Sequence, residues 1–361
     1  MSKIYDMKKY IPTNKTNKTK MHRAIGKIWL MIFCAILVLN SVSAQEEVSL
    51  DEELEAYLKR DYFNLNMLIQ AGARFSLYDD DFQGGRTFEA TNARIIIRGD
   101  LDKGFFYKIA INAVSDPVLL DAYVGYRFNE SLSIATGAMK PTQTLDFMPD
   151  PGSTDFIDRA KMTGLLVSSR EIGVSASGNI GGFYYYTGVF NGTRLKTNNN
   201  SRLYGIGRLQ YTIYDIIPAS VQLGLSASHG DSPGIRTGSN GPFLEGTRSL
   251  LGADLRIESE RMIWAAEYLA GELQVVGLAG EKELISGYYF TYGYAVSQDL
   301  MLLGRWQTWS YREADIRENM LTIGTNIIAT GLVSFQLNAD AYFPPEAKNR
   351  YGASFIFQVQ F

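Results

Sequence analysis

Apolar and polar residues alternate with a period of two over most of the chain from residue 62 onward. The last segment, 350–361, is the clearest case, because its apolar stripe runs to an aromatic residue at the very end, Phe361. Such a stripe, closed by a terminal Phe, is typical of the last lipid-facing strand of a transmembrane β-barrel. The pattern therefore predicts an all-β protein with one face of its sheet in contact with lipid.

The breaks in the alternation divide the chain into sixteen expected strands. Short connections such as 100–103 and 129–131 alternate with longer polar ones. Short periplasmic turns and longer outer loops give this arrangement in even-stranded barrels. We therefore expect a transmembrane antiparallel β-barrel of about 16 strands over residues 62–361. The expected strands span residues 62–77, 88–99, 104–114, 118–128, 131–140, 170–179, 182–191, 201–214, 219–229, 248–259, 261–271, 284–297, 300–310, 319–329, 331–342 and 350–361.

A soluble β-sandwich or propeller would also contain many short strands, but it would bury one face of each in a sealed core. Here the face opposite the apolar one carries amides such as Asn92, Gln222 and Asn338. Burying such groups without partners would cost about 1–3 kcal/mol each. We therefore expect water inside the barrel, which sixteen strands are wide enough to hold.

The start of the chain has the features of a secretory signal peptide. Lys27 precedes twelve unbroken apolar residues, 28–39, and small residues follow up to Ala44. As a helix this run would reach only about 18 Å, short of the roughly 30 Å of a bilayer core. We expect residues 1–44 to be cleaved off and residues 45–61 to form a short periplasmic lead-in.

Cleavage would remove the only cysteine, Cys34, and eight of the 35 basic residues but only one acid. The remaining chain would have 27 basic and 37 acidic residues, a net charge near −10. Such a chain has no disulfide, no thiolate nucleophile and no Cys-based metal site, and its charge argues against nucleic-acid binding. We expect no cofactor and no metal.

Strand parity assigns more basic than acidic residues to the lumen. An excess of arginine on a pore wall would concentrate anions and offer bidentate contacts to phosphate-like groups. The alternative is that these arginines pair with neighbouring acids and only brace the wall. The expected lumen-facing bases are Arg74, Arg94, Arg98, Lys108, Arg127, Arg202, Arg208, Arg256 and Arg305, and the acids are Asp121, Glu171, Asp254, Glu258, Glu267 and Asp340.

The connection 141–169 is the longest in the expected barrel. It is either an exposed flap or a segment folded inward that narrows the channel. Its apolar residues, among them Leu145, Phe147 and Phe156, favour the inward position, because an exposed loop has no reason to carry so many. Its acids weaken any expectation of strict anion selectivity.

Five short motifs stand in the first half of the barrel region, namely Asn92–Gly99, Leu120–Val124, Gly137–Pro141, Ser169–Val174 and Gly188–Gly192. In order and spacing they resemble the phosphate-selective porin O and P family. The resemblance extends over about residues 62–361 and implies a sixteen-stranded trimeric porin with an inward loop after the fifth strand. It also implies basic residues at the constriction, and Lys140, Arg159, Lys161 and Arg170 match the local motifs of the family.

Two other function classes fit less well. A barrel enzyme would need a general base near its nucleophile, but Ser228 and His229 are adjacent on a strand and point to opposite faces. A non-conducting barrel that binds partners through its surface loops is the runner-up. Its contacts would come from the expected outer loops 79–86, 191–201 and 230–241.

The sequence thus predicts an outer-membrane porin, surrounded by lipid, that lets small solutes diffuse passively. We expect a mild preference for anions, with phosphate or polyphosphate as candidate solutes, and a homotrimeric assembly.

Overall fold

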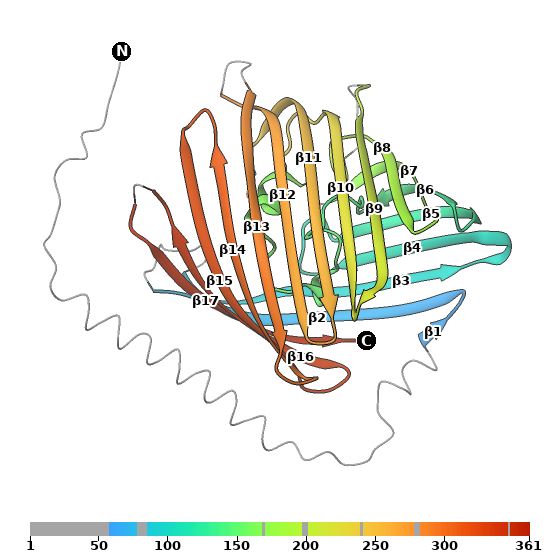
Figure 1. The fold of residues 1–361 in the computed structure, drawn as a ribbon. Helices are drawn as coiled ribbons and strands as arrows, with labels where there is room; N and C mark the ends of the chain where they lie inside the picture. Colours follow the sequence, from blue (N-terminus) through green and yellow to red (C-terminus); the bar gives the residue numbers. More distant parts are fainter. Residues whose placement is uncertain are drawn as a thin grey trace, which may run out of the picture. The chain divides into compact units, whose positions relative to one another are not determined.

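The computed structural model describes residues 58–77, 85–167, 170–196, 201–238, 241–277, 282–345 and 347–361. Within these ranges, strands β2 to β17 form one antiparallel sheet that closes on itself as a barrel (Figure 1). The expected signal peptide and most of the expected lead-in lie outside the described residues.

The strands are long and the helical elements short. In the described residues no helix is both long enough and apolar enough to cross a membrane. The elements are β1 (Lys59–Arg60), β2 (Phe63–Ser76), β3 (Arg86–Asp100), η1 (Asp102–Gly104), β4 (Phe105–Asn112), β5 (Leu119–Asn129), β6 (Leu132–Met139), η2 (Pro151–Ser153), α3 (Lys161–Leu166), β7 (Glu171–Ile180), β8 (Phe183–Phe190), β9 (Tyr204–Ile217), β10 (Ala219–Asp231), β11 (Leu244–Ser259), β12 (Met262–Val275), β13 (Lys282–Ala295), β14 (Leu300–Tyr311), β15 (Ile316–Ile328), β16 (Val333–Phe343) and β17 (Arg350–Gln360).

The barrel closes where its first and last strands meet. β17 pairs with β2 in antiparallel register, with Phe355 opposite Ala73, so the alternating C-terminal segment is the closing strand. The predicted sixteen-stranded antiparallel barrel is confirmed. The largest boundary differences, four residues each, fall at the start of β11 and the end of β12. There Leu244 pairs with Val275, and the register between β11 and β12 shifts before Arg248. Such an irregularity interrupts the alternation of apolar and polar residues, so the strand ends are not visible in the sequence.

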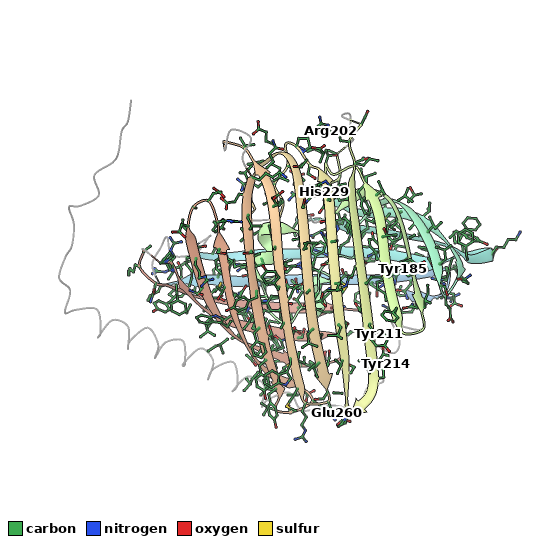
Figure 2. The ribbon with its side chains drawn as sticks, turned by 45° about the horizontal axis from the view of Figure 1, so that its top comes forward. Tyr185, Arg202, Tyr211, Tyr214, His229 and Glu260 are labelled. Carbon is green, nitrogen blue, oxygen red and sulfur yellow. The ribbon has the colours of Figure 1, made fainter. Side chains whose placement is uncertain are left out.

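The outward face carries aromatic pairs near the end of the barrel that has the short turns. Trp264 lies opposite Tyr292 with ring centroids 4.5 Å apart, and Phe183 stacks on Tyr211 at 4.4 Å. Figure 2 shows Tyr211 toward the same end of the strands as Glu260, with His229 at the other end. Aromatic rings near one end of the strands are typical of the interfacial girdle of a transmembrane barrel.

Part of the interior is a packed apolar core, which differs from the expected water-filled lumen. Leu165 and Leu166 of α3 are buried against Leu269, Leu273 and further residues of β11 to β15. The segment between β6 and β7 therefore lies inside the barrel, against this wall. Parity alone does not reveal such a core, because its apolar wall residues share the inward face with the polar ones.

Candidate functional site

The segment between β6 and β7, which we call the inward loop (described residues 140–167 and 170), is held by hydrogen bonds to the inner wall. Glu267 on β12 accepts hydrogen bonds from the backbone N–H groups of Leu145, at 2.6 Å, and Asp146, at 3.3 Å. Wall side chains from five further strands bond to its backbone. These contacts join Gln307 to Lys161, Arg305 to Asp158, Asn326 to Asp155, Gln336 to Thr154, Gln358 to Gly152 and Gln70 to Pro151.

The inward loop lies over several of the predicted pore arginines and pairs with them. Arg208 donates to the carbonyl of Gln143 in the loop at 3.2 Å and forms a 2.6 Å ion pair with Asp254 of β11, with both charged side chains fully buried. Arg305 is 3% exposed and lies 3.6 Å from Asp146 of the loop. Arg256 pairs with Asp155 of the loop at 2.9 Å. These three arginines brace the loop against the wall, as the alternative interpretation of the lumen charges expected.

A second connection also folds inward, between β10 and β11. Ser232, Ile235 and Thr237 are buried, and the Thr237 hydroxyl donates a hydrogen bond to the carbonyl of Leu165 in α3. Residues 230–241 were expected to form an outer loop, available to partners. Of the described residues in this range, Thr237 and Gly238 instead contact α3, and Ile235 joins the apolar core.

Open space, which we call the passage, remains beside the inward loop along β16, β17 and β2 to β4. It is a cavity of about 470 Å³ between the loop and this wall. Its charged lining residues are the bases Arg74, Arg94, Lys140, Arg159 and Arg170 and one acid, Asp158. The single acid is already neutralised, because both of its oxygens pair with Arg74. The passage therefore carries net positive charge.

The bases of the passage differ in how far they are compensated. Arg94 donates to the amide of Asn92 at 2.6 Å and forms no ion pair within the described residues. Arg170 lies 3.1 Å from Asp121, which also pairs with Lys108 at 3.0 Å, so one carboxylate serves two cations. Electrostatic compensation is incomplete along this wall.

Lys140 follows β6 directly and begins the inward loop. Its ammonium group donates to the carbonyls of Met148, at 2.9 Å, and Pro149, at 2.8 Å. Burial, followed by repulsion from the Arg159 guanidinium, lowers the pKa of Lys140 to about 7. The charge of Lys140 therefore changes near neutral pH.

A second basic cavity, of about 580 Å³, lies nearer the short-turn end of the same wall. Arg98 lies four residues beyond Arg94 on β3, about 13 Å along the strand, and faces Lys108 on β4. Arg98 forms no hydrogen bond or ion pair within the described residues. The basic residues that line this cavity are Lys59, Arg60, Arg98, Lys108 and Arg127, and the acids are Asp61 and Asp100.

The structure thus separates the predicted lumen bases into groups. Seven lie along the two basic cavities: Arg74, Arg94, Arg98, Lys108, Arg127, Lys140 and Arg170. Arg159 of the inward loop also faces the first cavity, and Lys161 begins α3. Arg208, Arg256 and Arg305 brace the loop, and Arg202 lies at the outer rim, 3.3 Å from Asp231.

Sequence reasoning missed three basic residues. Arg248 is 2% exposed, pairs with Glu171 at 3.0 Å and lies over the ring of Tyr204. It shares the parity of Asp254 on β11, so its position on the inner face was readable. Lys59 and Arg60 lie in β1, which pairs with β2 and is too short to show any periodicity.

Ser228 and His229 do not form a catalytic pair. Ser228 is buried inside, where Tyr204 donates to its hydroxyl, while the His229 ring contacts Ser249 on the outer surface at 2.8 Å. The described ranges also contain no group of three or more His, Cys, Asp or Glu side chains that could hold a metal ion.

Solved structures share this architecture at low sequence identity. The anion-selective porin from Comamonas acidovorans has a TM-score of 0.62 and 12% identity, covering 83% of this chain and 99% of that chain. Outer-membrane expressed OmpT of Vibrio cholerae has a TM-score of 0.61 and 10% identity, and the match covers 84% of this chain and 99% of that chain. The outer membrane channel DcaP of Acinetobacter baumannii has a TM-score of 0.55 and 11% identity, and the match covers 83% of this chain and 97% of that chain. No curated protein matches the chain.

The family comparison is more specific than the shared fold. Residues 63–319, well over half of the chain, match the phosphate-selective porin O and P family. The barrel with its inward loop agrees with this match, and the family consists of channels, not enzymes. The chain therefore belongs to the phosphate-selective porin O and P family and is an outer-membrane porin.

Proposed function

We propose that this porin is a passive diffusion channel with a mild preference for small anions, phosphate among them. The observation that carries the proposal is the charge of the passage beside the inward loop. Five bases face it against one acid, and that acid is paired with Arg74. Cations of this geometry raise the local concentration of anions and can bind phosphate oxygens in bidentate fashion.

The second basic cavity supports the same proposal. Arg94 and Arg98 are on one strand, and Lys108 adjoins Arg98 on the next. An anion that leaves the passage toward the short-turn end therefore meets a further group of cations about 13 Å away, the rise of four strand residues. Successive weak sites of this kind allow entry without trapping the solute.

The experiment is the zero-current potential of the purified protein in a planar bilayer under a KCl gradient. Phosphate is then added at constant chloride. The proposal expects a potential of the sign that chloride permeation gives and a chloride current that phosphate reduces. A potential of cation sign would contradict the anion preference, and an unchanged current would remove phosphate as a preferred solute.

The proposal extends to processing and assembly. Residues 1–44 are removed as a signal peptide, residues 45–61 lead into the barrel on the periplasmic side, and the mature chain forms a homotrimer in the outer membrane. One solved structure of similar fold, OmpT of Vibrio cholerae folded in vitro, is described as a trimer form. N-terminal sequencing of the mature protein and light scattering in detergent test these points.

A further inference from the structure

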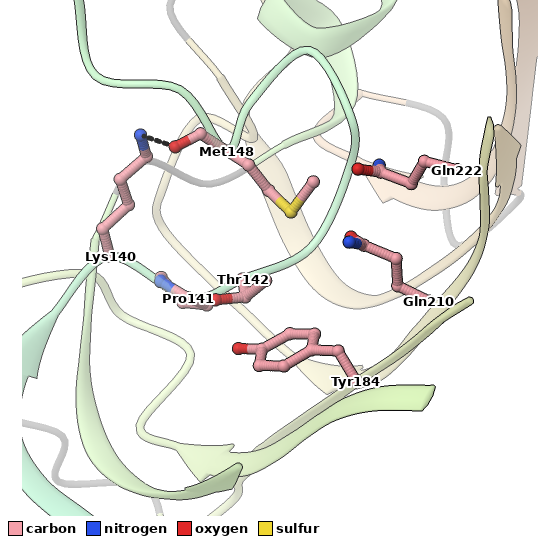
Figure 3. A pocket seen from close by; sticks show the side chains of 7 residues that line it. All are labelled: Lys140, Pro141, Thr142, Met148, Tyr184, Gln210 and Gln222. Carbon is pink, nitrogen blue, oxygen red and sulfur yellow. Dashed lines mark hydrogen bonds between the residues drawn. The ribbon is translucent and has the colours of Figure 1, made fainter. Parts of the chain in front are cut away.

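A further cavity, of about 330 Å³, lies inside the barrel and shares only Lys140 with the lining of the basic passage. It is bounded by β8, β9 and β10 and by the first residues of the inward loop (Figure 3). Tyr184 is the second residue of β8 and Gln222 the fourth of β10, and both strands begin at short turns. The cavity therefore faces the short-turn end of the barrel.

Strand register brings three polar side chains together on this wall. Tyr184 lies directly opposite Gln210, and Gln222 lies opposite Thr212, two residues further along β9. The three side chains therefore share the inner face and are neighbours across strands. Figure 3 shows both carboxamides and the Tyr184 hydroxyl pointing into the space, with the Met148 side chain from the inward loop beside them.

The polar groups of the cavity have hydrogen-bonding capacity to spare. The Nε2 atom of Gln222 is buried and has no partner within the described residues. The Nε2 of Gln210 reaches only the Thr212 hydroxyl, at 3.5 Å, the long limit of a hydrogen bond. A buried amide N–H without a partner is costly, so these groups favour an oxygen-bearing guest.

The charge of the lining selects among such guests. Among the described residues that line the cavity there is no carboxylate or guanidinium, and the one cation, Lys140, turns its ammonium group toward the carbonyls of Met148 and Pro149 and toward Asp150, 3.6 Å away. Carboxamides and a phenol each donate and accept hydrogen bonds, as a sugar hydroxyl does. The ring of Tyr184 and the side chains of Pro141 and Met148 add apolar surface for C–H groups.

We propose that this cavity is a binding subsite for a neutral, polyhydroxylated molecule of about the size of one monosaccharide. The volume is at the lower end of the range for small-molecule sites, about 300–1,000 Å³, which suits a single sugar ring. The subsite takes a different class of solute from the basic passage. The proposal of this subsite does not depend on whether the channel prefers anions.

The test uses D-glucose and the ion current through single channels in KCl. Glucose added on the short-turn side is expected to cause brief, saturable current reductions, beyond the effect of viscosity on bulk conductivity. The double variant Gln210→Leu with Gln222→Leu should raise the half-blocking concentration about tenfold, the effect of losing one to two hydrogen bonds. Tyr184→Phe, which removes only the hydroxyl, should raise it several-fold.

The matched control is Asn64→Leu, the same kind of amide-to-leucine change at the same end of the barrel but on β2. Glucose should block this variant at the same half-blocking concentration as the wild type. Open-channel current in KCl without glucose shows for every variant that the barrel has folded and conducts, so loss of the porin itself is seen separately. If glucose causes no block and no heat of binding in calorimetry, or if Asn64→Leu weakens block as much as the double variant, the proposal is overturned.

Discussion

Arg74 on β2 and Asp158 on the inward loop form a bidentate ion pair, with N–O distances of 2.5 and 2.9 Å. Arg74 also contacts Glu89 on β3 at 2.7 Å, so the loop is tied to two neighbouring strands of the wall along the passage. The pair has two effects. It holds the loop beside the passage, and it neutralises the one acid among the described residues that line the cavity.

Asp158→Asn should therefore increase the preference for anions. The change frees one positive charge beside the permeation path, and a unit charge about 4 Å away contributes ~1 kcal/mol in water, or up to about fivefold in the permeability ratio. The ratio follows from the reversal potential in a KCl gradient. Asp299→Asn, in a short turn far from the passage, removes the same charge and should change nothing. Equal shifts in both variants would show that Asp158 acts only through net charge.

Anion preference should also fall as the pH rises through neutrality. The lowered pKa of Lys140, about 7, means that its ammonium is charged below this pH and neutral above it. The anion permeability ratio of the wild type should therefore decrease between about pH 6 and pH 8. In Lys140→Gln the change over this interval should be absent, whereas Lys103→Gln, in a short turn, should keep it. A wild-type ratio that is flat from pH 6 to 8 would contradict a titrating Lys140.

Deletion of residues 146–158 should raise single-channel conductance. The deletion removes the part of the loop that carries Asp155 and Asp158, together with the backbone groups bound by Asn326 and Gln336. The lumen would widen along the wall from β15 to β17. Conductance in 1 M KCl, which reduces the influence of surface charge, measures this width. A conductance equal to that of the wild type would show that the loop does not limit the pore.

The buried Arg208–Asp254 pair should matter for stability more than for selectivity. Asp254→Ala would leave an unpaired guanidinium in a fully buried position, which costs about 3–5 kcal/mol. Guanidinium unfolding in detergent measures the loss. The double variant Asp254→Ala with Arg208→Leu removes both charges and should recover most of it. If the double variant is less stable than the single one, the penalty does not come from an unpaired charge.

The barrel was predictable from strand parity, that is, from the alternation of apolar and polar side chains along each strand. Parity places Gln70, Arg94 and Asp254 on one face and Trp264 and Tyr292 on the other, because side chains alternate along any strand. The strand boundaries follow where the register is regular and drift where it shifts, as at Leu244.

Parity could not divide the inner wall into an open and a covered part. Arg94 and Arg305 have the same orientation, yet the first lines the passage and the second is buried under the loop. The difference depends on which wall the inward loop packs against, and that choice comes from contacts between residues far apart in the chain, such as Leu166 with Leu269. A period of two contains no information about such contacts.

In the proposed function, anions pass along the wall that carries Arg94 and Arg98. The direct test is the reversal potential of Arg94→Glu with Arg98→Glu in the same KCl gradient as the wild type, with Arg261→Glu, in a short turn, as the control. The reversal potential of the double variant should shift toward cation preference, whereas that of the control should stay near the wild-type value. An unchanged reversal potential in the double variant would contradict anion permeation along this wall, because it would place the ion path elsewhere in the barrel.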